Sequence, residues 1–223
     1  MRVNRMLQII ALASLAVVLS AVSAKADGGT VNVTVNTSSL SGTQTIVFGI
    51  TDGDGAVDNS VALSDFTFGG GSADGSASYY GTGVSGDLSS LIAMNDSGFS
   101  ALFEQQFDVG SSLSFVLATT DNFAGVTPDA FAMYICDATL STCYSDDADS
   151  GAMLILNLTG GTVTPSSFIL TGASDQGLPA PVVTGVTTPE PASVLLLGLG
   201  LALLALMSRA RSSAAAGKQR LLA

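Results

Sequence analysis

The sequence predicts an all-β fold, an antiparallel β-sandwich with a jelly-roll-like arrangement, and three observations lead to this prediction. Short stretches of alternating apolar and polar residues recur about every ten residues between positions 30 and 170. Gly, Ser, Asn and Asp separate these stretches, as expected for tight turns. Charged residues are few in this part, whereas Gly and Ser are abundant. Many short strands joined by turns are typical of two packed antiparallel sheets.

The expected strands begin with TVNVTVN (30–36), in which three valines alternate with polar residues as in a half-buried strand. The others, in chain order, are QTIVFGI (44–50), SVALSDFTF (60–68), SASYYGT (76–82), GDLSSLIAM (86–94), SLSFVLATT (112–120), DAFAMYIC (129–136), GAMLILNL (151–158) and a short SSFIL (166–170).

The segment 99–108 is ambiguous, because Phe99, Phe103 and Phe107 have helical spacing. We expect a strand there, since turn-like residues bound the segment on both sides. The ten phenylalanines of the chain all lie in this β-rich part and are the expected core. The strongest core candidates are Phe48, Phe66, Phe68, Phe115 and Phe131.

The N-terminal end has the three-part pattern of a secretory signal peptide. Two arginines precede the apolar stretch 7–19, and Ala24-Lys25-Ala26 offers an A-x-A cleavage site. We therefore expect a signal peptide over 1–26, delivered to the general secretion machinery and cleaved after Ala26 or, as second choice, after Ala24. A retained signal anchor is the alternative.

The C-terminal end combines a stiff turn, an apolar run and basic residues. Pro189-Glu190-Pro191 precedes residues 192–207, which carry no charge. As a transmembrane helix this run would reach about 24 Å, somewhat less than a hydrocarbon core of about 30 Å. Arg209 and Arg211 follow as a membrane stop, so we expect the tail 212–223 to stay cytoplasmic.

This order of parts resembles the PEP-CTERM sorting signal of Gram-negative bacteria, matched by Pro189-Glu190-Pro191, the run ASVLLLGLGLALLALM and the arginines after it. The resemblance implies an exported protein, held transiently in the inner membrane facing the periplasm and processed by an exosortase. Its final place would be the cell surface or the extracellular matrix. An unprocessed C-terminal anchor is the alternative. The VNTSSL opening also looks like a PEP-CTERM subgroup of unknown function with a single β-rich domain.

The expected organisation is therefore a signal peptide (1–26), an acidic β-sandwich (27–172), a flexible linker (173–188), a sorting signal (189–211) and a cytoplasmic tail (212–223). The linker is expected because 173–188 is rich in Pro, Gly and Thr and lacks periodicity.

The charge distribution excludes several classes of function. Residues 27–188 contain seventeen acidic residues and no Lys, Arg or His. Nucleic-acid binding is excluded, because no side chain there can neutralise phosphates. The usual general bases and activated nucleophiles are also missing, so we expect no enzyme. A glycosidase with two carboxylates is the remaining catalytic alternative.

The segment 52–59 is the strongest candidate for a ligand site. Asp52, Asp54 and Asp58 alternate with glycines and resemble part of a calcium-binding loop, so they are the candidate calcium ligands. An acidic hairpin turn is the alternative, because Asp-Gly is a common turn signal. Three further acids lack glycine spacing and are expected in a solvated loop: Asp146, Asp147 and Asp149.

Two residue pairs complete the candidates. Cys136 and Cys143 are the only cysteines, and in an oxidising periplasm we expect them to form a structural disulfide. Tyr79 and Tyr80 could stack on a sugar ring, although a strand places one of two neighbours inward.

The sequence thus predicts an exported, non-enzymatic protein of the cell envelope or extracellular matrix. Its role would be structural or adhesive and linked to exopolysaccharide, with an exosortase as its processing partner and no cofactor of its own. The alternative is a calcium-dependent carbohydrate-binding module.

Overall fold

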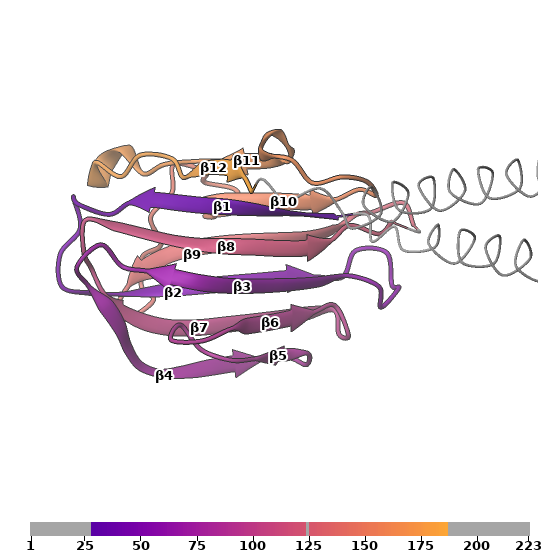
Figure 1. Ribbon diagram of the computed structural model, residues 1–223, viewed down its shortest axis with the longest axis horizontal. Helices are drawn as coiled ribbons and strands as arrows, with labels where there is room; N and C mark the ends of the chain where they lie inside the picture. Colours follow the sequence, from indigo (N-terminus) through magenta and orange to yellow (C-terminus); the bar gives the residue numbers. More distant parts are fainter. Residues whose placement is uncertain (1–27, 124, 187–223) are drawn as a thin grey trace, which may run out of the picture. The chain divides into compact units, whose positions relative to one another are not determined.

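The computed structural model describes residues 28–123 and 125–186, which form two six-stranded antiparallel sheets (Figure 1). This confirms the predicted all-β sandwich. One sheet consists, in spatial order, of β12 (Val182–Gly185), β1 (Gly28–Asn36), β8 (Ser112–Thr120), β3 (Ser60–Thr67), β6 (Ile92–Asn95) and β5 (Val84–Ser85). The other consists of β11 (Phe168–Leu170), β10 (Leu154–Leu158), β9 (Asp129–Asp137), β2 (Thr43–Thr51), β7 (Ser100–Asp108) and β4 (Ser72–Tyr80).

The strand pairing is nested as in a jelly roll. Strand β1 pairs with β8, β2 pairs with β7, and β3 pairs with β6. Most connections between consecutive strands therefore change sheets, and three of these crossings matter for the site: β2–β3, β6–β7 and β8–β9. The registers place all three of these crossings at one end of the sandwich, since Thr51 lies opposite both Ser100 and Ala130, and Ser60 lies opposite Asn95.

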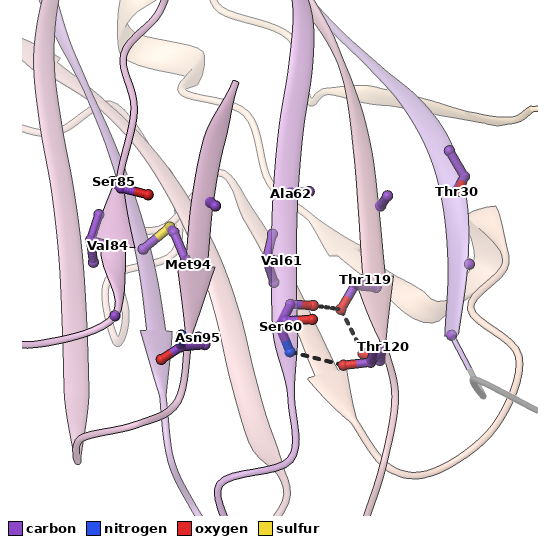
Figure 2. A pocket seen from close by; sticks show the side chains of 15 residues that line it. Thr30, Ser60, Val61, Ala62, Val84, Ser85, Met94, Asn95, Thr119 and Thr120 are labelled. Atoms are coloured by element: carbon purple, nitrogen blue, oxygen red, sulfur yellow. Dashed lines mark hydrogen bonds between the residues drawn. The ribbon is translucent and has the colours of Figure 1, made fainter. Parts of the chain in front are cut away.

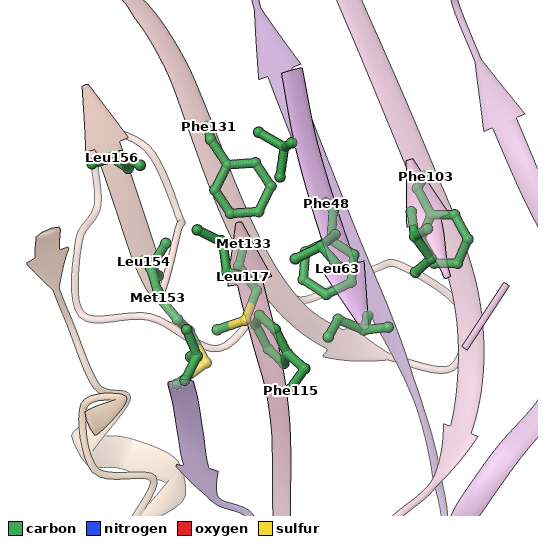
Figure 3. Packing of buried hydrophobic residues seen from close by; sticks show 14 of the residues in the cluster. Phe48, Leu63, Phe103, Phe115, Leu117, Phe131, Met133, Met153, Leu154 and Leu156 are labelled. Atoms are coloured by element: carbon green, nitrogen blue, oxygen red, sulfur yellow. The ribbon is translucent and has the colours of Figure 1, made fainter. Parts of the chain in front are cut away.

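In most strands the core follows from alternation of buried and more exposed residues, whereas β2 is buried along nearly its whole length. In β8, every second side chain from Leu113 to Leu117 is buried, and the residues between them face outward. Phe48 lies at the centre of the core (Figure 3). Its ring centroid is 5.4–6.2 Å from the rings of four other phenylalanines: Phe66, Phe103, Phe115 and Phe131.

The expected core is largely confirmed. Phe48, Phe115 and Phe131 are fully buried, and Phe66 and Phe68 are half-buried against them. Two further phenylalanines, Phe103 and Phe107, are also buried, because the expected strand forms as β7 and the odd-numbered residues of β7 face inward. The expectation fails for two residues in the crossings that stay exposed: Phe99 and Phe123.

The predicted strand 86–94 is wrong as a single element. The structure has β5 and β6 with a turn between them. The Asp87 carboxylate accepts hydrogen bonds from the Ser89 N–H at 2.8 Å and from the hydroxyls of Ser89 and Ser90. These local bonds favour a turn over an extended strand. In contrast to the expected 76–82, β4 also begins four residues earlier.

The predicted linker 173–188 also differs from the structure. Ala173 and Leu178 are buried and exchange two backbone hydrogen bonds of 2.8 and 2.9 Å. Asp146 accepts the Ser174 N–H, and β12 then pairs with β1. The composition resembles a linker, but the outer edge of β1 offers unpaired backbone groups that this segment satisfies.

A disulfide joins Cys136, near the end of β9, to Cys143. The turn between them is held by the Asp137 carboxylate, which accepts bonds from Thr139 and Ser141. Closing an eight-residue ring is worth about 2.5 kcal/mol in the chain-entropy account.

The predicted targeting segments lie outside the described residues. These are the signal peptide with Ala24 and Ala26, the helix 192–207, and Arg209 and Arg211. Within the described ranges, no helix combines the length and the hydropathy needed to cross a membrane.

Phe48→Ala should destabilise the full-length protein by about 3–5 kcal/mol, because it removes a ring packed among four others. Phe99→Ala is the matched control, since Phe99 is 79% exposed and should change stability by less than about 0.5 kcal/mol. Chemical denaturation measures both. Equal effects would contradict the core assignment.

Leu178→Ala should destabilise the protein by about 2–5 kcal/mol, because Leu178 is buried in the segment that carries β12. Val182→Ala, at a side chain that is 59% exposed, should have little effect. If thermal unfolding shows no difference between the two variants, 173–186 behaves as a linker after all.

Candidate metal centre

The three crossings bring several acidic side chains together at one end of the sandwich. They are the β2–β3 connection (52–59), the β6–β7 connection (96–99) and the β8–β9 connection (121–128, of which Ala124 is not described). In the described part of the chain, two overlapping carboxylate trios share Asp129, the first residue of β9. Asp52 and Asp54 form one trio with it, and Asp58 and Asp96 form the other.

Asp129 is held in place by the β2–β3 connection. Its Oδ1 accepts the N–H of Gly53 at 2.7 Å and that of Asp54 at 3.4 Å. Its Oδ2 accepts the side-chain amide of Asn59 at 2.7 Å. Residue 53 is glycine for a steric reason, since a Cβ there would collide with the Pro128 carbonyl oxygen.

Asp96 is fully buried, and its two oxygens differ in their surroundings. Oδ2 accepts the N–H groups of Asn59 at 2.8 Å and Asp58 at 3.2 Å. Oδ1 is also buried, and no N–H or hydroxyl donor in the described part of the chain reaches it, so its polar neighbour there is the Asp129 carboxyl. A buried carboxylate oxygen without a donor destabilises the folded state by about 1–3 kcal/mol or more. A bound cation or a proton would remove this penalty.

Asn59 connects the crossings. Besides Asp129, its side-chain amide donates to the Asn122 carbonyl at 2.9 Å, and its Oδ1 accepts the Asn122 N–H at 2.8 Å. The Asn122 side chain donates in turn to the Asp58 carbonyl at 2.7 Å. The carboxylates are thus oriented by a fixed network of amides.

The surroundings of Asp96 and Asp58 disfavour the ionised form of their carboxyl groups. Burial raises the pKa of Asp96, the backbone N–H groups of Asn59 and Asp58 oppose that rise, and the Asp129 carboxyl adds to it through a side-chain hydrogen bond and through its charge. Burial is also the main cause that raises the pKa of Asp58, and Asp54, Asp129 and Asp52 add to it by charge repulsion. A bound cation would reverse this unfavourable balance.

The structure separates the three aspartates that the sequence singled out. Asp52 and Asp54 meet at one side of Asp129, and Asp58 meets Asp96 at the other. Sequence reasoning missed Asp96 and Asp129, because each is an isolated acid beside a strand with no local motif. Their positions in the topology could have indicated them. Asp96 and Asp129 lie at connections that reach the same end of the sandwich as 52–59.

The remaining candidates have local structural roles. Asp147 accepts the N–H of Asp149 and the hydroxyl of Ser150, so it caps its own turn. Tyr79 and Tyr80 are both about half exposed, at 47% and 54%. The Tyr79 hydroxyl donates to the Gly86 carbonyl at 2.6 Å, which ties β4 to the start of the β5–β6 turn.

A shallow groove of about 760 Å³ crosses the outer face of the sheet that contains β1 (Figure 2). Small side chains lie opposite one another across five strands and form its floor: Thr30, Ala118, Ala62, Ala93 and Ser85. The groove extends to Ser60, Asn95 and Thr120 at the end where the acidic cluster lies.

Comparison with known proteins identifies the C-terminal segment. Residues 187–212 match the PEP-CTERM protein-sorting motif, which confirms the resemblance seen at Pro189-Glu190-Pro191 and the apolar run after it. This motif indicates an exported protein that is anchored transiently in the membrane and processed by an exosortase. No curated protein and no solved structure matches the chain.

Asn59→Ala should destabilise the protein by about 2–3 kcal/mol, because it removes the donor to Asp129 and the acceptor for Asn122 inside a buried network. Asn32→Ala, on the exposed face of β1, serves as the control and should be nearly neutral. Urea denaturation distinguishes them. A neutral Asn59→Ala would show that the network does not hold the crossings.

Proposed function

We propose that the chain is a non-enzymatic, structural or adhesive component of the cell envelope or the extracellular matrix. One observation carries this proposal: the sorting motif begins at residue 187, directly after the domain that ends with β12. The motif therefore delivers a single folded domain whose own chemistry is limited to carboxylates, hydroxyls, amides and apolar surface. Such a domain is suited to binding and packing rather than to catalysis.

The proposed route begins with a signal peptide over 1–26 and the general secretion machinery. The apolar run 192–207 would then hold the protein in the inner membrane, with Arg209 and Arg211 on the cytoplasmic side. The domain would face the periplasm until the exosortase acts near Pro189-Glu190-Pro191. Release to the surface or matrix would follow.

The grooves support a non-enzymatic role. A glycosidase needs two carboxyl groups about 5–10 Å apart on either side of a substrate groove. No acidic residue lines the groove on the β1 sheet, and two smaller grooves contain one each, Asp65 and Glu104. The carboxylates that do lie close together are those of the buried cluster, where a sugar ring has no access to Asp96 or Asp129.

The charge of the domain supports a link to exopolysaccharide. Seventeen acidic residues without a cationic side chain give the domain a strongly negative field. Such a surface repels other anionic chains in low salt and associates with them when divalent ions bridge the two. An adhesive role would therefore depend on the divalent ions of the surroundings.

A calcium-dependent carbohydrate-binding module is the second candidate, and the position of the groove favours it. Ser60, Asn95 and Thr120 line the groove, and their neighbours in the chain, Asn59, Asp96 and Asp121, lie at the acidic end. Binding to a glycan array that disappears with a chelator would favour this candidate over the structural one.

Replacing Pro189, Glu190 and Pro191 by alanine should block processing, because the exosortase loses its recognition sequence. Cell fractionation and intact-mass measurement should find the parent protein shortened at both ends, and the triple variant retained in the membrane with its C-terminal tail. Pro179→Ala, at an exposed proline, is the control and should be processed normally. Identical mature masses for parent and triple variant would contradict the proposed route.

A further inference from the structure

We propose that a calcium ion binds between the carboxylates of Asp58, Asp96 and Asp129 and joins the three crossings at this end of the sandwich. The inference concerns the domain itself and holds whether its role is structural or carbohydrate-binding. The site differs from the one that the sequence suggested, since only Asp58 belongs to both.

The geometry fits a hard cation. Each of the three residues offers a carboxylate oxygen, and these oxygens lie within 4.8 Å of one another. Calcium binds oxygen at 2.3–2.6 Å, so oxygens around one ion are separated by up to about 5 Å. Asp58 is half-buried, and its position at the surface leaves room for water to complete the coordination.

The unpartnered oxygen of Asp96 is an independent indication of a ligand. The residue is fully buried, and among the described residues no N–H or hydroxyl group donates to its Oδ1. No cationic side chain exists between residues 27 and 188 to neutralise it. Two ligands could satisfy this oxygen: a metal ion, or a proton shared with Asp129. A calcium ion offsets two of the three negative charges of Asp58, Asp96 and Asp129, whereas a single shared proton offsets only one.

Hydrogen bonds orient two of the three carboxylates, as they do around the ligands of metal sites. Asp96 is held through Oδ2 by two N–H groups, so Oδ1 remains available. Asp129 is held by Gly53 and Asn59. Both carboxylates are therefore positioned before an ion arrives, which lowers the entropy lost on binding.

The outer trio of Asp52, Asp54 and Asp129 is a weaker candidate. The carboxylate of Asp52 accepts the Gly55 N–H at 2.6 Å, and that of Asp54 accepts the Ala56 N–H at 2.8 Å. These bonds close local turns of the type that Asp-Gly sequences form without a metal. Both side chains are also more exposed than Asp96, so solvent can satisfy their oxygens.

Calcium binding here would couple the folding of the domain to export. Sites of extracellular modules have dissociation constants of about 0.1–1 mM, so they fill only where calcium is abundant. The three crossings would be held together by the ion after export. Gly28 and Gly185, where β1 begins and β12 ends, lie on the same side of the domain as these crossings.

The test is thermal unfolding of the full chain, purified in a mild detergent, in the presence of a chelator or of 5 mM calcium. The expected result is a rise in Tm of about 4–8 °C with calcium. Magnesium at 5 mM and sodium chloride at equal ionic strength should give a clearly smaller rise. Calorimetric titration should give about one calcium per chain. No rise, or an equal rise with magnesium, would overturn the proposal.

Asp96→Asn distinguishes calcium binding by Asp96 from the structural hydrogen bonds that this residue accepts. The amide keeps one oxygen for the two N–H groups and replaces the unpartnered oxygen by a donor that can face Asp129. The calcium-free Tm should therefore stay the same or increase, while the response to calcium is lost. A variant that keeps the full response would overturn the proposal.

Two further variants locate the site. Asp149→Asn, which removes the same charge from an exposed turn, should keep the calcium response. Asp52→Asn should keep most of it, because Asp52 belongs to the outer trio. Loss of the response in Asp52→Asn but not in Asp96→Asn would assign the ion to the outer trio and contradict the inference.

Discussion

The carboxylates of this domain have no cationic side chain to pair with, and each must be satisfied in another way. At the surface, hydroxyl and backbone N–H groups do so. Ser141 and Thr139 hold the pKa of Asp137 well below its usual range, and the hydrogen bonds of Ser89 lower that of Asp87 in the same way. At the buried cluster the donors do not suffice, and burial raises the pKa of Asp96 instead. The lack of cationic side chains therefore produces hydrogen-bonded turns at the surface and a candidate cation site at the buried cluster.

The topology decides where this shortage of donors is concentrated. Nested pairing of β1 with β8, β2 with β7 and β3 with β6 sends three crossings through one end of the sandwich. Asp58, Asp96 and Asp129 are far apart in the sequence and meet only because of this wrapping. A simple meander of hairpins would have placed the same acids on separate turns, each open to water.

The sequence predicted the architecture well because alternation along strands is a local property. The segment 99–108 was assigned correctly because turn-like residues bound it, and Phe48 was recognised as core. Local composition misled where tertiary contacts decide: 173–188 reads as a linker, yet Leu178 is buried and β12 completes the edge of β1. The metal candidates were found only in part, since a motif shows Asp52, Asp54 and Asp58 but no pattern links them to Asp96 or Asp129. The sorting motif was recognised because its signal lies in the order of its parts along the chain.

The most direct measurement is the anomalous diffraction of calcium. It requires crystals of the exported protein that are grown in millimolar calcium. We expect one peak with carboxylate oxygens of Asp58, Asp96 and Asp129 at about 2.3–2.6 Å, including the Asp96 oxygen to which no N–H or hydroxyl group donates. A well-ordered cluster without a peak, in which Asp96 and Asp129 lie within hydrogen-bonding distance and share a proton, would contradict this expectation.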